Sequence, residues 1–117
     1  MNSKPLESLA HRLREFAAAR DWDQFHSPKN LAMALVAEAG ELAAEFQWFT
    51  EAQSHAPDAE ARSRIRAEAA DVFIYLVRLS DKLGFDLLAA ANAKIAENER
   101  RYPADKVRGS SRKYTEY

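Results

Sequence analysis

Apolar residues recur every three or four positions along most of this 117-residue chain. That spacing is typical of amphipathic helices, whereas a half-buried strand would place an apolar residue at every second position. Only three Gly and four Pro interrupt the chain, and Ala, Leu, Glu and Arg are plentiful, which favours helices. The sequence therefore predicts an all-α protein, and a chain of this length with 47% hydrophobic residues is expected to form a single domain, residues 1–117.

Local start and stop signals divide the periodic pattern into four helices, a four-helix bundle-like subunit. The second helix begins at Ser27 and Pro28, where a capping side chain precedes a proline. The third ends at Gly84, and Asp86 caps the fourth. The four helices are expected at about residues 4–20, at 28–50, around the apolar residues 65–83, and at 86–101. Residues 53–59 are predicted to be a polar connection, and residues 104–117 an irregular tail.

Two pairs of carboxylates lie inside the predicted second and third helices. Glu38 and Glu41 share one face of the second helix, and Glu68 and Asp71 share one face of the third, because each pair is three residues apart. Antiparallel packing of the two helices would bring both acidic stripes together. Unpaired charges are costly to bury, and carboxylate oxygens are the ligands that hard divalent cations prefer. We expect a Mg²⁺ site, with Mn²⁺ or Ca²⁺ as alternatives.

Two alternatives to the magnesium site have to be weighed. Glutamates three residues apart are common on solvent-exposed helices, so the stripes could be ordinary surface. A di-iron site would require Glu-x-x-His on two helices, but the fourth residue here is Glu or Asp. His11, His26 and His55 do not stand in that position. Ligation by oxygen alone favours Mg²⁺, which is usually shared with substrate phosphates.

Aromatic side chains accompany the predicted acidic stripes. Trp22 and His26 precede the second helix, while Trp48 and Tyr75 continue the stripes of the second and third helices. A planar ring could stack among them. The alternative is structural, with Trp22 as a hydrophobic staple for the helix start and Trp48 as part of the core. Gly40, a helix-weakening residue beside the acidic pair, is consistent with close packing at this point.

Charge and hydropathy exclude several classes of protein. Seventeen basic and eighteen acidic residues nearly cancel, which argues against binding a nucleic acid polymer. The longest apolar run, residues 31–37, is too short to span a membrane. Because cysteine is absent, nothing demands an oxidising compartment, and we expect a cytoplasmic protein. The segment from Lys94 to Lys113 carries more basic than acidic residues, so it could bind a small polyanion.

The order of the carboxylates resembles a known family signature. Glu-x-x-Glu, a gap of 26 residues and then Glu-x-x-Asp is similar to the pattern of the MazG-like all-α nucleoside triphosphate pyrophosphohydrolases. Further segments look like the dCTP pyrophosphatase branch of that family. They are residues 20–31, residues 38–42 with 46–48, and residues 101–103, 108–110 and 113–115 near the C-terminal end. The resemblance thus covers nearly the whole chain.

This resemblance implies Mg²⁺-dependent hydrolysis of a nucleoside triphosphate, dCTP or a modified dCTP, to the monophosphate and pyrophosphate. Water would attack the α-phosphorus, with the metal held by Glu38, Glu41, Glu68 and Asp71. Glu41 is chosen over Glu38 as the residue that accepts the proton of the water. The implied role is removal of unwanted nucleotides from the cellular pool.

The resemblance also implies a set of substrate contacts and an assembly. The nucleobase would be met by Trp22, His26, Trp48 and Tyr75, and the phosphates by Lys94, Asn98, Arg101 and Tyr102. Family members associate as dimers and tetramers, which predicts a homo-oligomer. This chain has Leu13 where dCTP-specific members carry histidine, so dUTP or another triphosphate stays open as the substrate. From another class, the open alternative is a non-catalytic helical module whose acidic stripes bind a basic partner.

Overall fold

The computed structural model describes residues 4–111, and within that range the chain is helical with no strand. The predicted all-α fold is therefore confirmed. No helix in this range has both the length and the apolar character that crossing a membrane requires. The elements, in chain order, are α1 (Pro5–Ala19), the 3₁₀ helix η1 (Asp23–Phe25), α2 (Pro28–Ala44), α3 (Glu51–His55), α4 (Ala59–Leu83), α5 (Leu87–Arg101) and α6 (Ala104–Val107).

Capping residues start and stop the helices where the sequence predicts them. The Ser27 hydroxyl accepts a hydrogen bond from the backbone N–H of Asn30 at 3.1 Å, which fixes the start of α2. The Asp86 carboxylate caps α5 in the same way. Gly84 ends α4 in the left-handed conformation, with φ of +74°. These local signals explain why α2 and α5 begin, and why α4 ends, where the sequence predicts. The start of α4 differs, because the Asp58 side chain caps the helix at Ala59, earlier than the apolar residues 65–83 that predicted it.

The expected continuation of α2 to Thr50 is wrong, because α2 ends at Ala44 and residues 45–48 form a turn. The reason is a second capping motif. The Thr50 hydroxyl accepts from the Gln53 backbone N–H at 3.1 Å, and the Gln53 side chain accepts from the Thr50 backbone N–H at 2.9 Å. This capping box starts α3, so the expected polar connection is helical in its first part.

The chain divides after Gly84 into two compact units. The second unit holds α5 and α6, so the first residues of the predicted tail form one short helical turn. Residues 112–117 lie outside the described range. They include Lys113, Tyr114 and Thr115, which carried part of the resemblance at the C-terminal end.

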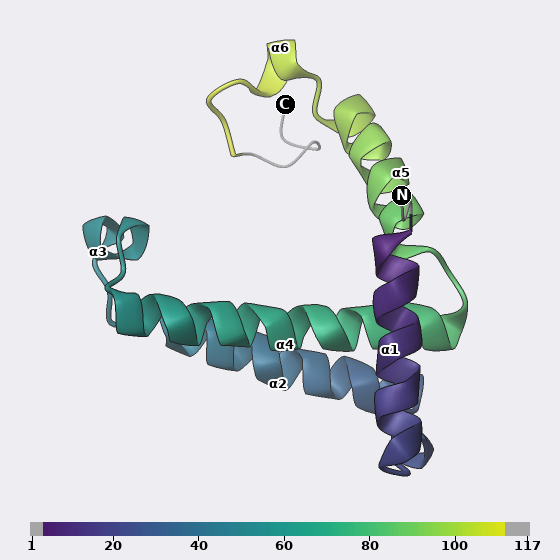
Figure 1. Ribbon diagram of the computed structural model, residues 1–117. Coiled ribbons are helices and arrows are strands. Elements are labelled where there is room, and N and C mark those ends of the chain that lie inside the picture. The colour runs from purple at the N-terminus through teal and green to yellow at the C-terminus, as the bar shows by residue number, and fades with distance from the viewer. Residues whose placement is uncertain (1–3, 112–117) are drawn as a thin grey trace. The chain divides into compact units, whose positions relative to one another are not determined.

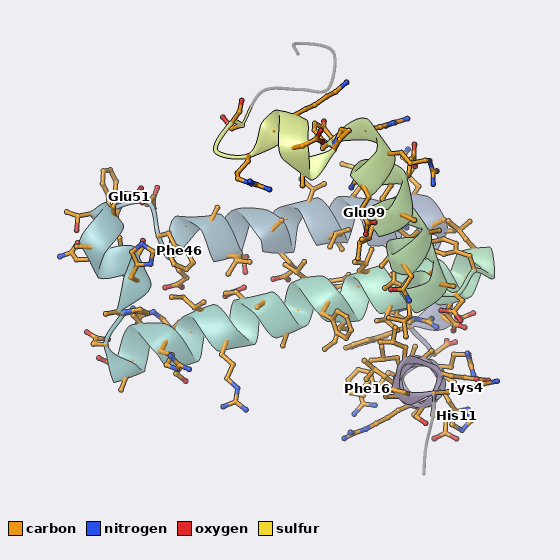
Figure 2. All side chains as sticks on the ribbon, turned by 90° about the horizontal axis from the view of Figure 1, so that it is seen from above. Lys4, His11, Phe16, Phe46, Glu51 and Glu99 are labelled. Atoms are coloured by element: carbon orange, nitrogen blue, oxygen red, sulfur yellow. The ribbon has the colours of Figure 1, made fainter. Side chains whose placement is uncertain are left out.

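The first unit is built on the contact between α2 and α4, which lie side by side and antiparallel, while α1 crosses α4 near its C-terminal end (Figures 1 and 2). Leu31 of α2 and Val77 of α4 are 1% and 2% exposed, and Ala17 of α1 is equally buried. Phe46 lies in the turn that follows α2 and is labelled beside α3 in Figure 2. Its ring packs edge-on against the ring of Phe49. This arrangement aligns the acidic stretches of α2 and α4.

The described part of one chain leaves one side of α2 exposed, although the middle of this helix, residues 31–37, is entirely apolar. Small and apolar residues form an outward stripe of α2 that is exposed along its length, and it consists of Met33, Val36, Ala37, Gly40 and Ala44. Met33 and Val36 are 63% and 67% exposed. A Cβ added at Gly40 would meet no atom within 4 Å, so the close packing expected there is not made within the chain.

Candidate functional site

Three glutamates converge where α2 packs against α4. Glu38 and Glu41 lie one turn apart on α2, and Glu68 lies on α4. Each offers a carboxylate oxygen within 4.8 Å of the others. Sequence reasoning placed these residues on facing stripes, and the antiparallel contact brings them together. We call Glu38, Glu41 and Glu68 the carboxylate cluster.

Within the described part of the chain, the carboxylate cluster lies without a basic neighbour to neutralise it. Burial, followed by the charges of Glu41 and Asp71, raises the pKa of the Glu38 carboxyl above its usual value. Burial and the charge of Glu41 raise the pKa of Glu68 in the same way. Among residues 4–111, no basic side chain forms an ion pair with the cluster. Oε2 of Glu38 and Oε2 of Glu68 are buried without a hydrogen-bond partner in the described chain.

Two nearby carboxylates differ from the cluster. Glu45, which continues the acidic stripe past the end of α2, is neutralised by Arg64, whose Nε donates to Oε1 of Glu45 at 2.9 Å. Asp71 is exposed and is not one of the three converging carboxylates, but its charge contributes to the raised pKa values of Glu38 and Glu68. Asp71 therefore lies at the edge of the cluster, and Glu45 belongs to a separate ion pair.

The cluster fits a hard divalent cation. Its donors are all carboxylate oxygens, two of which are buried atoms that lack a partner in the described range. An unpaired buried polar atom is costly, and a bound cation removes that cost while neutralising the repulsion among the three charges. Ligands of this type suit Mg²⁺ or Mn²⁺ rather than the softer transition metals.

The four aromatic or imidazole residues predicted around a base are not all brought together by one chain. Trp22 and His26 precede α2, and the Trp22 ring lies edge-on to Phe16 at 5.7 Å between centroids. Tyr75 lies half-buried on α4, one turn beyond Asp71. Trp48 follows the opposite end of α2 and is 86% exposed, so it is neither on the helix nor in the core of this chain. The whole of α2, seventeen residues and about 25 Å of helix, lies between Trp48 and the segment that holds Trp22 and His26.

A buried arginine that sequence reasoning did not single out holds the segment before α2. Arg78 of α4 is 3% exposed, and its Nη2 donates to Oδ1 of Asp23 at 2.9 Å. The same Nη2 lies 3.2 Å from Nδ1 of His26. Lys82 donates to the same oxygen of Asp23, and these two partners lower the pKa of the Asp23 carboxyl. An arginine in the middle of the apolar stretch of α4 was the available signal, since a buried guanidinium needs a carboxylate partner.

The predicted phosphate contacts lie in the second unit, on or just after α5. Lys94 and Arg101 both form ion pairs with Glu97, at 3.3 and 2.6 Å. These cations lower the pKa of the Glu97 carboxyl. Asn98 lies on the same exposed stretch of α5, and Tyr102 ends the helix. The Glu97 carboxylate thus lies between the two cations on α5.

Comparisons with known proteins find relatives over most of the chain. The model of the MazG-like family matches residues 33–117. Human (Homo sapiens) dCTP pyrophosphatase 1 is 49% identical over 113 residues, a match that covers 95% of this chain and 66% of the human protein. Cattle (Bos taurus) dCTP pyrophosphatase 1 is 44% identical over 98% of this chain and 70% of its own length. The chain thus spans about two thirds of the length of these curated relatives.

The fold is also similar to a solved structure. The crystal structure of a pyrophosphatase from Archaeoglobus fulgidus superposes with a TM-score of 0.74 at 37% identity. The superposition covers 83% of this chain and 91% of that one. The similarity therefore includes most of both chains rather than one helix pair.

Proposed function

This chain belongs to the MazG-like family, and we propose that it is a nucleoside triphosphate pyrophosphohydrolase that acts on dCTP or a modified dCTP. The products would be the nucleoside monophosphate and pyrophosphate. The observation that carries this proposal is the carboxylate cluster, with raised pKa values at Glu38 and Glu68 and no paired cation in the described chain. A buried group of acids at the contact of two helices is a site for a cation and its polyanionic substrate.

Glu38, Glu41 and Glu68 would hold Mg²⁺ or Mn²⁺, with Asp71 at the edge of the site. The metal would supply charge neutralisation for the triphosphate and activation of the attacking water. Glu41 is the most exposed member of the cluster, so its carboxylate is open to solvent and is the proposed acceptor of the proton of that water. Glu38 and Glu68, which are more buried, fix the geometry of the cluster.

The remaining residues are proposed to bind the nucleotide. Trp22, His26 and Tyr75 would form the base pocket together with Trp48, through ring stacking and hydrogen bonds to the base edge. Lys94, Asn98, Arg101 and Tyr102 would contact the phosphates. A chain without cysteine needs no oxidising compartment, and we propose that the enzyme removes nucleotides from the cytoplasmic pool.

We further propose that the enzyme is a homo-oligomer, a dimer or tetramer. The outward stripe of α2 leaves Met33 and Val36 more than half exposed beside Gly40 and small alanines. A surface of this kind resembles the inner face of a helix-helix contact more than a solvated face. A second copy of the chain would cover it.

The test is an assay of pyrophosphate release from a panel of dNTPs and NTPs with Mg²⁺. We expect turnover with dCTP or a 5-modified dCTP, loss of turnover in Glu41→Ala, and no loss in a Lys29→Ala control, because Lys29 is an exposed residue outside the proposed site. A preference for dUTP would contradict dCTP as the substrate but would still support the proposed pyrophosphohydrolase reaction. No turnover on any nucleotide, together with binding of a basic peptide by the acidic stripes, would instead support the non-catalytic helical module.

A further inference from the structure

His26 has one ring nitrogen engaged by a buried cation. Nη2 of Arg78 lies 3.2 Å from Nδ1 of His26 and 2.9 Å from Oδ1 of Asp23. Nη1 of Arg78 lies 3.8 Å from Oδ2 of Asp81, one turn further along α4. Arg78 is only 3% exposed, so its guanidinium is held by these partners rather than by solvent. The contact therefore joins the segment before α2 to the interior of the first unit.

The identity of the donor fixes the protonation of the imidazole. A guanidinium carries five N–H donors, has no acceptor, and stays charged in proteins. Nδ1 of His26 must therefore accept the hydrogen bond, which requires that Nδ1 carries no proton. A neutral imidazole of this kind holds its proton on Nε2. Protonation of both nitrogens would set an N–H of the ring against an N–H of the cation.

The electrostatic surroundings agree with a neutral ring. Burial lowers the pKa of His26, and the positive charge of Arg78 lowers it further. The negative charge of Asp23 acts in the opposite direction, and the positive charge of Lys82 adds to that of Arg78. The pKa of His26 is lowered overall, because burial and the charges of Arg78 and Lys82 together outweigh the charge of Asp23.

The second nitrogen of the ring is left for a ligand. Within residues 4–111, Nε2 of His26 has no hydrogen-bond partner, and the side chain is only half-buried. An Nε2–H group in this position is a hydrogen-bond donor that the described part of the chain does not use. An acceptor supplied by a ligand would satisfy it.

We propose that Arg78 is a positioning residue that holds His26 as the neutral Nε2–H tautomer, so that His26 presents a hydrogen-bond donor to the nucleobase. The ligand atom it recognises is an acceptor, either a ring carbonyl oxygen or an unprotonated ring nitrogen. That the ligand is a nucleotide rests on the proposed function. The tautomer of His26 rests only on its contact with Arg78. The exocyclic amino group of cytosine is itself a donor, so it cannot accept the hydrogen bond that Nε2–H of His26 donates.

The tautomer is measured by long-range ¹H–¹⁵N correlation NMR on the ¹⁵N-labelled protein without nucleotide, at about pH 7.5. His26→Gln identifies the His26 signals, and the exposed His11 and His55 serve as internal references. We expect the Nε2–H tautomer for His26, and a titration midpoint below the ordinary value for histidine, because the pKa of His26 is lowered. A ring that carries its proton on Nδ1, or that is doubly protonated at this pH, would overturn the proposal.

The role of Arg78 is tested by Arg78→Met, which keeps a long side chain and removes the donors. We expect the proton of His26 to distribute over both nitrogens, and KM for dCTP to rise roughly tenfold while kcat changes less than twofold. Lys82→Met removes a partner of Asp23 but not of His26, and we expect it to keep the Nε2–H tautomer. An Arg78→Met protein that keeps both the tautomer and KM would refute the positioning role.

The wild-type protein alone can reject the proposal. If Arg78→Met does not fold, the wild-type spectrum still decides, because any state other than Nε2–H rejects the proposal. Turnover and tautomer are also separate measurements. An inactive protein with the Nε2–H tautomer would reject the proposed function alone, and an active protein with the Nδ1–H tautomer would reject this inference alone.

Discussion

At the residue scale, the chain pairs some of its acids and leaves others unpaired. Glu45 has Arg64, and Asp23 has Arg78 and Lys82. The carboxylate cluster has no basic partner among the described residues, although it lies only a turn from Glu45. The sequence could predict the cluster because spacing along a helix determines which side chains share a face. It could not predict Arg78, because its partners Asp23 and His26 lie more than fifty residues away in sequence.

Unpaired charge in the cluster predicts that removing one carboxylate stabilises the metal-free protein. We expect Glu68→Gln to raise the melting temperature by a few degrees in EDTA, because a neutral amide ends the repulsion with Glu41 and Glu38. The same variant should lose the stabilisation that excess Mg²⁺ gives the wild type. Differential scanning fluorimetry with and without Mg²⁺ measures both effects.

The matched control is Glu45→Gln, which removes a carboxylate that Arg64 already neutralises. We expect no rise in its melting temperature and an unchanged response to Mg²⁺. The pH dependence has a defined sign. The pKa of Glu68 is raised in the folded state, so wild-type stability recovers as the pH falls toward the ordinary pKa of a glutamate, and the advantage of Glu68→Gln shrinks. An advantage that is constant or grows as the pH falls would contradict charge repulsion as its cause.

At the element scale, the starts of α2 and α5 were predictable, and the end of α2 was not. Ser27 and Asp86 act through hydrogen bonds to residues three positions away, so a short window of sequence is enough to predict their roles. The residues from Glu45 to Phe49 continue the helical pattern without a glycine or proline. What ends α2 before them is a competing start, the capping box of Thr50 with Gln53, which fixes the backbone in an extended conformation at Thr50.

The end of α4 offers a prediction about backbone conformation. Gly84 has φ of +74°, a region that residues with a Cβ rarely adopt. We expect Gly84→Ala to lower the free energy of unfolding by about 1 kcal/mol. Gly84→Asn should lose less, because asparagine tolerates the left-handed conformation better than alanine. Urea denaturation of the three proteins gives the order, and an alanine variant as stable as the asparagine variant would show that another conformation is adopted there.

At the scale of the whole molecule, two observations point to sites completed by a second copy. The outward stripe of α2 is apolar, exposed and open at Gly40. The residues proposed for the base pocket lie at opposite ends of α2, with Trp22 and His26 before it and Trp48 after it. About 25 Å of helix separates them, which is more than a nucleobase can bridge. If all of them contact one base, Trp48 must come from a neighbouring chain.

Mixing two impaired variants tests this directly. Glu41→Ala lacks a cluster carboxylate, and Trp48→Ala lacks the proposed stacking ring, while the 86% exposure of Trp48 means that its removal leaves the fold intact. After the subunits are dissociated and reassociated together, a symmetric dimer with shared sites regains an intact site in each mixed pair. Activity at low dCTP should rise to about a quarter of the wild-type value.

The control mixture is Glu41→Ala with Glu68→Gln. These two residues belong to the carboxylate cluster of a single chain, so no mixed pair contains an intact site and no activity should return. Sedimentation velocity on the wild type provides the independent measurement, with dimers or tetramers expected. Two results would contradict a site shared between chains. One is a wild-type protein that sediments as a single chain, and the other is a Glu41→Ala and Trp48→Ala mixture no more active than the average of its parts. In either case Trp48 would be an ordinary surface residue of one subunit. The base pocket would then consist of Trp22 and His26, which precede α2, and Tyr75 of α4.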